Sequence, residues 1–124
     1  MLIVDDHEET REMYAWCLRA SGWVVEEASA GDEALLLAGQ FEPDAIVMDL
    51  RLPVLGGLEA IRRLKRDEGV KHIPILACTG FDPLRAESTA RDAGCDAFVS
   101  KPCEPEKLRI LLESLIGRTR DSRE

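Results

Sequence analysis

The sequence predicts an α/β domain in which a doubly wound, five-stranded parallel sheet lies between two layers of helices. The first observation behind this prediction is that five short apolar runs alternate along the chain with five segments of helical character. The second is that these runs lack the polar–apolar alternation of half-exposed strands, so both faces of each strand are expected to be buried. The third is the length of 124 residues, which suits a single three-layer domain.

The elements of the first half are recognised by their apolar positions and by the glycines that end them. A helix is predicted over residues 8–20, where apolar side chains recur at i, i+3, i+4 and i+7. Its expected buried face consists of Met13, Trp16, Cys17 and Ala20. The remaining elements are strands over Leu2–Val4 and Ala45–Met48, a second strand that starts with Trp23–Val25, and a helix over residues 31–39.

The second half repeats the pattern after a loop marked by Pro53, Gly56 and Gly57. We expect the domain to span residues 1–117 and residues 118–124 to form a polar tail. The elements are a helix with Leu58, Ile61 and Leu64 inward, a strand over Ile73–Cys78, a helix from Asp82-Pro83 to Gly94, a strand over Ala97–Val99, and a helix with Leu108, Leu111, Leu112 and Leu115 buried.

The composition argues against several classes of function. The 24 acidic residues exceed the 16 basic ones and give a net charge of −8, which disfavours nucleic acid and anionic membranes as partners. No apolar run is long enough to span a membrane, and no signal peptide is recognisable. The four cysteines show no C-x-x-C spacing, so we interpret them as reduced side chains of a cytoplasmic protein; in a secreted domain they would suggest two disulfides instead.

Polar side chains follow four of the predicted strands. They are Asp5-Asp6, Asp49, Thr79 and Lys101. Because the carboxyl ends of parallel strands meet at one edge, where ligands bind in open α/β sheets, these side chains are expected to lie together. Each alone has a structural explanation, since an acid can cap a helix or begin a loop and a lysine can simply lie on the surface. Their coincidence at one edge favours a functional site.

The chemistry of this group is that of a cation and phosphate site. Three neighbouring carboxylates repel one another unless a positive charge lies among them. Carboxylate oxygens are hard ligands that suit Mg²⁺, and Mg²⁺ held in this way usually also binds phosphate. Lys101 and the Thr79 hydroxyl would then contact phosphoryl oxygens from the other side.

The same residues resemble the motifs of response-regulator receiver domains, the phosphorylated modules of two-component signalling. The resemblance covers the chain from Leu2 to about Ile116 and implies a flavodoxin-like fold with the strand order 2-1-3-4-5. Its motifs are Leu2-Ile3-Val4-Asp5-Asp6-His7, Met48-Asp49 followed by Pro53, Thr79-Gly80 and Lys101-Pro102.

The resemblance also implies roles for the acidic residues. Asp49 would be the phosphoacceptor, whose carboxylate attacks a phosphohistidine and becomes an acyl phosphate. Mg²⁺ (or Mn²⁺) would be bound directly by Asp6 and Asp49, through a water by Asp5, and by the backbone carbonyl of Arg51.

Four further residues receive roles from the resemblance. Lys101 would pair with a phosphoryl oxygen, and the peptide bond between Lys101 and Pro102 would be cis. Thr79 would turn toward the phosphoryl group, and Phe98 would swing inward as Thr79 moves. Thr79 and Phe98 would thus form the switch.

The function implied is a phosphorylation-dependent signalling switch in the cytoplasm. The phosphoryl donor would be a histidine kinase or a histidine phosphotransfer protein, and phosphorylation would shift the domain toward an active conformation. A downstream protein would bind the surface from about Pro83 to Leu115. We expect a signalling domain, not an enzyme, although one that assists its own phosphorylation and dephosphorylation. It would be a monomer or a weak, phosphorylation-dependent dimer, without nucleic acid or membrane as a partner.

The sequence fits three other classes of protein less well. A receiver-like docking module that is never phosphorylated usually lacks one of the key acids or the lysine, whereas this chain has all of them. A flavin-binding domain would need a phosphate loop after the first strand, where the acids of this chain would repel phosphate. A phosphatase or mutase that forms an aspartyl phosphate would need D-x-D, which Asp49-Leu50-Arg51 does not provide. The domain could stand alone or belong to a larger protein such as a hybrid kinase.

Overall fold

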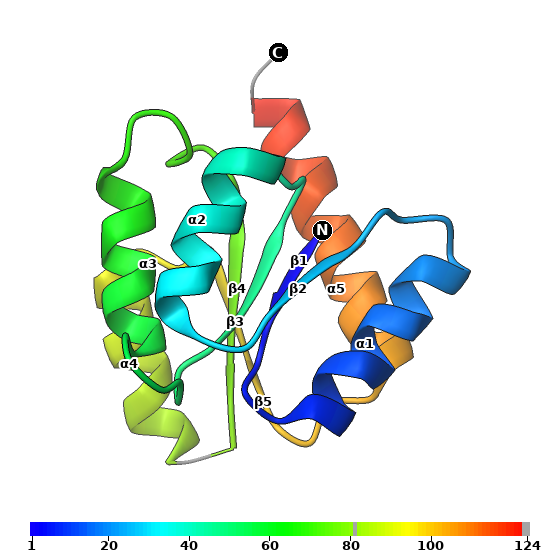
Figure 1. Ribbon diagram of the computed structural model, residues 1–124, viewed down its shortest axis with the longest axis horizontal. Helices are drawn as coiled ribbons and strands as arrows, with labels where there is room; N and C mark the ends of the chain where they lie inside the picture. Colours follow the sequence, from blue (N-terminus) through cyan, green and yellow to red (C-terminus); the bar gives the residue numbers. More distant parts are fainter. Residues whose placement is uncertain (81, 123–124) are drawn as a thin grey trace.

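The computed structural model describes residues 1–80 and 82–122, without the side chains of residues 83 and 120–122. Five parallel strands form one sheet in the order β2-β1-β3-β4-β5, which confirms the predicted fold class (Figure 1). The elements, in chain order, are β1 (Leu2–Val4), α1 (Glu8–Ala20), β2 (Glu26–Ala28), α2 (Gly31–Phe41), β3 (Ile46–Asp49), α3 (Gly57–Arg66), β4 (Ile75–Thr79), α4 (Pro83–Ala93), β5 (Ala97–Ser100) and α5 (Pro105–Ser122).

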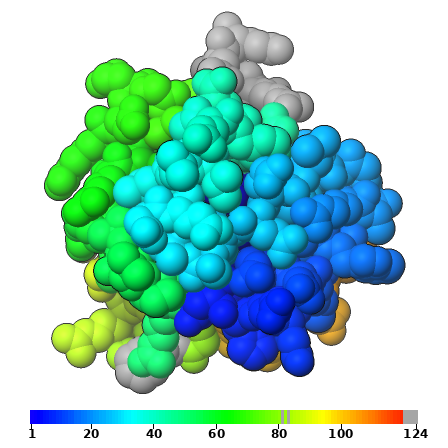
Figure 2. Space-filling view, in the orientation of Figure 1, coloured from blue at the N-terminus to red at the C-terminus, as the bar shows by residue number. Residues whose placement is uncertain are grey.

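Helices cover both faces of the sheet, with α1 and α5 on one face and α2, α3 and α4 on the other (Figure 1). Alternate residues of each strand enter opposite cores, as the two-residue period of a strand requires. Ile3, Val47 and Leu76 face α1 and α5, whereas Val4 and Met48 face the other three helices. In the space-filling view α2 and α3 lie side by side (Figure 2). All these side chains are buried, so the sheet is a rigid base for groups at its edge.

The predicted buried face of α1 is wrong. Trp16 is 73% exposed and Met13 is 46% exposed. The helix instead buries Tyr14, Ala15 and Leu18. These three residues complete the i, i+3, i+4, i+7 pattern only when Arg11 occupies the first position, and a basic residue does not contribute to an apolar pattern. The sequence therefore favoured the neighbouring set, which contains the larger apolar side chains.

The predicted second strand is also displaced. The sequence predicts that the second strand starts at Trp23–Val25, but β2 consists of Glu26–Ala28, and Val24 is 69% exposed. Because β2 lies at the edge of the sheet and pairs only with β1, it needs little apolar surface. An edge strand of this kind does not produce the apolar run by which a buried strand is recognised.

The remaining elements lie close to their predicted positions, and three of them differ in extent by more than one residue. α2 continues past the predicted end at Gly39 to Phe41. β4 begins at Ile75, not at Ile73, since a proline at position 74 cannot donate to the ladder. α5 continues to Ser122, so the predicted polar tail is helical as far as residue 122, and residues 123 and 124 lie outside the described residues. Within the described part of the chain, none of the helices combines the length and apolar character that a membrane span requires.

The four cysteines are free thiols with different accessibility. Burial raises the pKa of the Cys78 thiol to about 12, and it also raises the pKa values of Cys95 and Cys103. Only Cys17, on α1, is partly exposed. Since the thiolate is the reactive form, we expect a thiol reagent at pH 8 to modify Cys17 rapidly in the native protein and the other three only after denaturation. Rapid native modification that persists in a Cys17→Ser variant would contradict this assignment.

Candidate functional site

The candidate site lies at the carboxyl edge of the sheet, at the bottom of the molecule in Figure 1, where the predicted residues converge. Asp49 and Thr79 are the last residues of β3 and β4, Asp5 follows β1, and Lys101 follows β5. Asp5, Asp49 and Thr79 are the buried polar residues among those described, at 3%, 6% and 3% exposure. Such burial is unusual for acids unless they have partners, so the contacts of each one decide the chemistry of the site.

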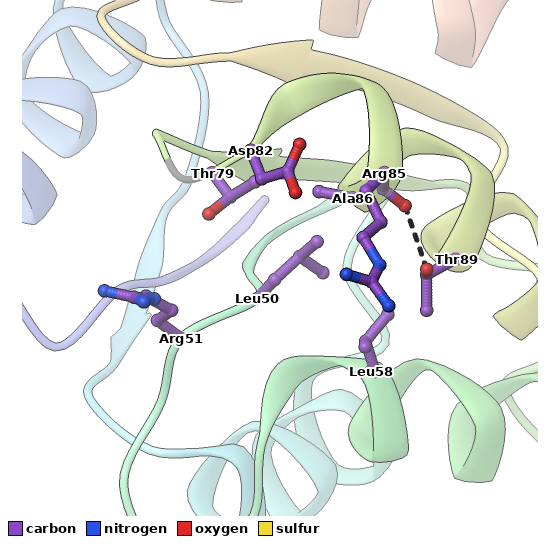
Figure 3. A pocket seen from close by; sticks show the side chains of 8 residues that line it. All are labelled: Leu50, Arg51, Leu58, Thr79, Asp82, Arg85, Ala86 and Thr89. Atoms are coloured by element: carbon purple, nitrogen blue, oxygen red, sulfur yellow. Dashed lines mark hydrogen bonds between the residues drawn. The ribbon is translucent and has the colours of Figure 1, made fainter.

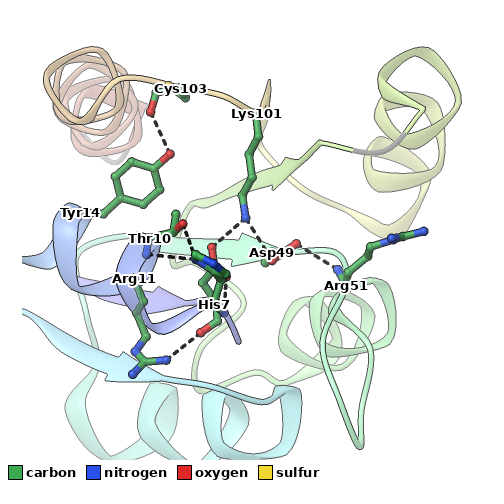
Figure 4. A network of polar contacts seen from close by, with 9 residues as sticks. His7, Thr10, Arg11, Tyr14, Asp49, Arg51, Lys101 and Cys103 are labelled. Carbon is green, nitrogen blue, oxygen red and sulfur yellow. Dashed lines mark hydrogen bonds and ion pairs between the residues drawn. The ribbon is translucent and has the colours of Figure 1, made fainter.

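One ammonium group serves two carboxylates. The Lys101 Nζ atom lies 2.8 Å from the Asp5 Oδ2 atom and 3.2 Å from the Asp49 Oδ2 atom. In Figure 4, the Lys101 side chain extends from the end of β5 across the sheet edge toward the acids. The site therefore carries more negative than positive charge, because Asp6 adds a third, exposed carboxylate beside this pair.

The second oxygen of each buried acid accepts a hydrogen bond from the backbone. The His7 N–H donates to the Asp5 Oδ1 atom at 2.8 Å, and the Arg51 N–H donates to the Asp49 Oδ1 atom at 3.0 Å. Both donors lie two residues after the acid, in the turns that leave β1 and β3. Each carboxylate is thus held in one orientation from two sides, which leaves little rotation to be lost when a ligand binds.

Burial raises the pKa of Asp49 above its ordinary value, and the nearby charge of Asp5 acts in the same direction. The Arg51 N–H and the Lys101 ammonium oppose this shift without cancelling it. Burial alone would lower the pKa of Lys101, but the hydrogen bond to Asp5 and the charges of Asp49 and Asp5 raise it above its ordinary value. Lys101 is therefore firmly charged. Ionisation of Asp49 costs free energy, and additional positive charge nearby would remove that cost.

Asp5, Asp6 and Asp49 can together hold a metal ion. One oxygen atom from each lies within 4.8 Å of the others. Asp6 and Asp49 open into a cavity of about 490 Å³, which Arg51, Thr79 and Lys101 also line. Three hard oxygen donors of this kind fit Mg²⁺, which keeps several of its waters and binds few protein carboxylates. The chemistry of the donor set therefore agrees with the predicted cofactor.

The two predicted switch residues occupy different places. Thr79 is buried in the wall of the site cavity. Phe98 lies on β5 opposite Ala77, partly buried against the core under α2, α3 and α4. The peptide bond between Lys101 and Pro102 is cis. The structure thus places Thr79 in the site, and it places Phe98 within the sheet, outside the residues that line the site cavity.

Several supporting residues were not recognised from the sequence. Gly57 is one, because a Cβ atom there would lie 2.1 Å from the Asp49 carbonyl oxygen, so only glycine lets α3 approach the end of β3. Tyr14 is another, since its hydroxyl donates to the Cys103 carbonyl at 2.8 Å and ties α1 to the segment after Lys101 (Figure 4). The paired glycines at 56 and 57 could have signalled a close backbone contact, whereas nothing in the sequence marks Tyr14.

A second cavity of about 340 Å³ lies between the loop after β3, α3 and α4. Its walls include the apolar side chains of Leu50, Leu58 and Ala86, with Arg85 extending toward Leu58 (Figure 3). Thr79 belongs to the walls of both cavities. A movement of Thr79 would therefore change the surroundings of the acids and of α4 together.

A buried acid beside two further acids and a lysine, at the carboxyl edge of a 2-1-3-4-5 sheet, is the arrangement of a signalling receiver domain. Residues 1–113 match the response regulator receiver domain family, and the chain belongs to that family. A curated relative is the polar-differentiation response regulator DivK of Brucella ovis, which is 37% identical over 94% of this chain and 95% of its own length.

Solved structures agree with this chain in fold. The receiver domain of the sensor histidine kinase PA1611 from Pseudomonas aeruginosa PAO1 has a TM-score of 0.86 and 31% identity, over 94% of this chain and 95% of that one. That structure holds a magnesium ion in its active site cleft. The chemotaxis response regulator CheY4 of Vibrio cholerae has a TM-score of 0.85 and 31% identity, over 92% and 95% of the two chains. Receiver domains are signalling domains that interact with histidine kinases or phosphotransfer proteins and switch by phosphorylation.

Proposed function

We propose that this protein is a phosphorylation-dependent switch that accepts a phosphoryl group on Asp49 from a histidine kinase or a histidine phosphotransfer protein. The observation that carries the proposal is the environment of Asp49. This carboxylate is buried at the cavity wall, oriented by the Arg51 N–H and Lys101, and adjacent to a set of acids that can hold Mg²⁺. Orientation and charge neutralisation are what phosphoryl transfer requires, because its transition state spreads negative charge over the phosphoryl oxygens.

The proposed transfer uses the chain's own residues as follows. One Asp49 oxygen forms a bond to phosphorus while the bond between phosphorus and the donor's histidine nitrogen breaks, and the electron pair leaves with the imidazole. The product is an acyl phosphate on Asp49. Mg²⁺ would be held directly by Asp6, Asp49 and the Arg51 carbonyl, and through a water by Asp5, and it would supply positive charge to the phosphoryl oxygens. Lys101 exchanges its contact with Asp49 for a contact with a phosphoryl oxygen, which keeps its charge compensated.

The proposed output runs through Thr79. Its hydroxyl would donate to a phosphoryl oxygen, and Phe98 would move inward in response. Since Thr79 also lines the cavity beside α4, this movement would change the surface from about Pro83 to Leu115, where we place the downstream protein partner. Phosphorylation adds charge and acceptor oxygens on one side of an equilibrium, so it shifts populations between two conformations. We place the domain in the cytoplasm, as a monomer or a weak dimer when phosphorylated.

The direct test is incubation with a small acyl-phosphate donor, followed by intact-mass measurement. We expect one phosphoryl adduct in the presence of Mg²⁺, none in excess chelator, and none in Asp49→Asn. The matched control is Asp92→Asn, which changes an exposed acid on α4 and should still form the adduct. No adduct on the wild-type protein with any donor would reject the proposal and favour the unphosphorylated docking module.

A further inference from the structure

Arg11 contacts the acidic turn from the side opposite Lys101. It extends from α1, and its Nη1 atom donates to the backbone carbonyl oxygen of Asp5 at 3.0 Å (Figure 4). Its side chain is 16% exposed, so the contact lies mostly out of water. The remaining polar atoms of Asp5 also have partners, because its N–H donates to the Ala28 carbonyl and its carboxylate is held by His7 and Lys101.

Arg11 is itself fixed by an acid on the edge strand. Its Nε atom lies 3.2 Å from the Glu27 Oε1 atom. The other Glu27 oxygen lies 3.1 Å from the Arg19 Nη1 atom, and Arg19 Nη2 donates to the Val25 carbonyl at 2.7 Å. The planar guanidinium of Arg11 therefore links a strand carboxylate to the turn through two fixed directions, which an ammonium group cannot reproduce.

The carbonyl that Arg11 holds belongs to the peptide group that joins Asp5 to Asp6. This group is planar, so fixing its oxygen also fixes the direction in which the chain enters Asp6. Asp6 is exposed, and for its side chain, unlike that of Asp5, the described structure records no hydrogen bond. The position of the Asp6 carboxylate thus depends on the orientation of this peptide plane.

We propose that Arg11, supported by Glu27, is a positioning residue for the metal site: it sets the relative orientation of the Asp5 and Asp6 carboxylates through the peptide that joins them. The inference rests on the proposed function, since it assumes that these acids bind Mg²⁺. The charge of Arg11 and its positioning role predict opposite effects of its removal on the affinity for Mg²⁺. If Arg11 acted only through its charge, its removal would strengthen the binding of a cation. If it positions the acids, its removal weakens that binding.

The test measures the affinity for Mg²⁺ by titration, with the amide NMR shifts of Asp49 and Arg51 as the readout. We expect Arg11→Gln to bind Mg²⁺ about 10-fold more weakly. A loss of affinity of this order is typical when a residue that holds a metal ligand in place is replaced. Arg11→Lys keeps the charge and should also bind more weakly than wild type. The matched control is Arg19→Gln, which removes a positive charge from the same helix and from the same Glu27 contact but leaves the Asp5 carbonyl bonded. Its affinity should stay equal to that of wild type or increase slightly.

An Arg11→Gln variant that binds Mg²⁺ as tightly as wild type, or more tightly, overturns the proposal. If Arg11→Gln does not fold, as its circular dichroism would show, Arg11→Lys decides, and wild-type affinity in that variant overturns the proposal. The wild-type titration separates the two levels of inference. A wild-type protein that does not bind Mg²⁺ removes the proposed metal site and this inference together, whereas wild-type binding with unchanged variants removes only the role of Arg11.

Discussion

Replacing Lys101 with methionine is expected to lower the free energy of unfolding by about 3 kcal/mol at pH 7 in the absence of Mg²⁺. The reason is that Lys101 is the cation in contact with both Asp5 and Asp49, whose side chains are only 4% and 8% exposed. Methionine keeps most of the side-chain volume but leaves two buried carboxylates facing each other without compensation. Removal of one partner of a buried ion pair is costly mainly for this reason.

Urea denaturation followed by circular dichroism measures this loss. The matched control is Lys71→Met, since Lys71 pairs with Glu68 on the surface, where their side chains are 50% and 84% exposed. Such exposed pairs contribute about 0–1 kcal/mol, so the control should be nearly as stable as wild type. If Mg²⁺ binds among the same acids, adding it should restore part of the stability that Lys101→Met loses. Equal stability of the two lysine variants in chelator would show that Lys101 does not compensate the acids.

The positions of the site residues could be predicted because buried parallel strands end abruptly. Asp49 and Thr79 each terminate a continuous apolar run, so a strand boundary and a site residue are recognised together. The parallel topology then brings these residues together, because the carboxyl ends of parallel strands meet at one edge of the sheet even when they are far apart in the chain. Lys101 could be placed at the same edge as the acids on this ground, whereas its direct contact with Asp5, at 2.8 Å between the charged atoms, is seen only in the structure.

Residues that act through the backbone could not be predicted in this way. Arg11 contacts a carbonyl oxygen, which every residue has, so no partner in the sequence reveals it. The same arginine explains why the buried face of α1 was misassigned: it occupies the first position of the face that Tyr14 and Leu18 continue. A polar residue that is partly buried because it contacts the backbone interrupts the apolar pattern of its helix. Its backbone contact also leaves no signal in the sequence. Errors of helix phase therefore tend to occur beside sites.

Replacing Asp49 with asparagine is expected to stabilise the metal-free protein while it abolishes phosphorylation. Burial raises the pKa of Asp49 in the folded protein above the value of 3.8 that is ordinary for an aspartate. The stabilising contribution of the protonated acid is complete below pH 3.8 and is lost as the pH rises through the folded-state pKa. Asparagine has no such loss, and its side-chain oxygen can still accept the hydrogen bond from the Arg51 N–H.

The gain in the free energy of unfolding should therefore be largest at neutral pH, above the roughly 0.5 kcal/mol typical of surface substitutions, and should shrink as the pH falls toward 4. Urea denaturation in chelator at several pH values measures it, with Asp92→Asn, an exposed acid on α4, as the matched control. Mg²⁺ should reduce the gain, because a cation among the acids stabilises the wild-type carboxylate more than the amide. A variant less stable than wild type at pH 7 in chelator would contradict the prediction and would mean that Lys101 fully compensates Asp49. The expected combination is a carboxylate that costs stability and that the proposed phosphorylation requires. Both effects would have one cause: in the absence of Mg²⁺, the proposed nucleophile Asp49 is held in a buried and acidic environment that disfavours its charge.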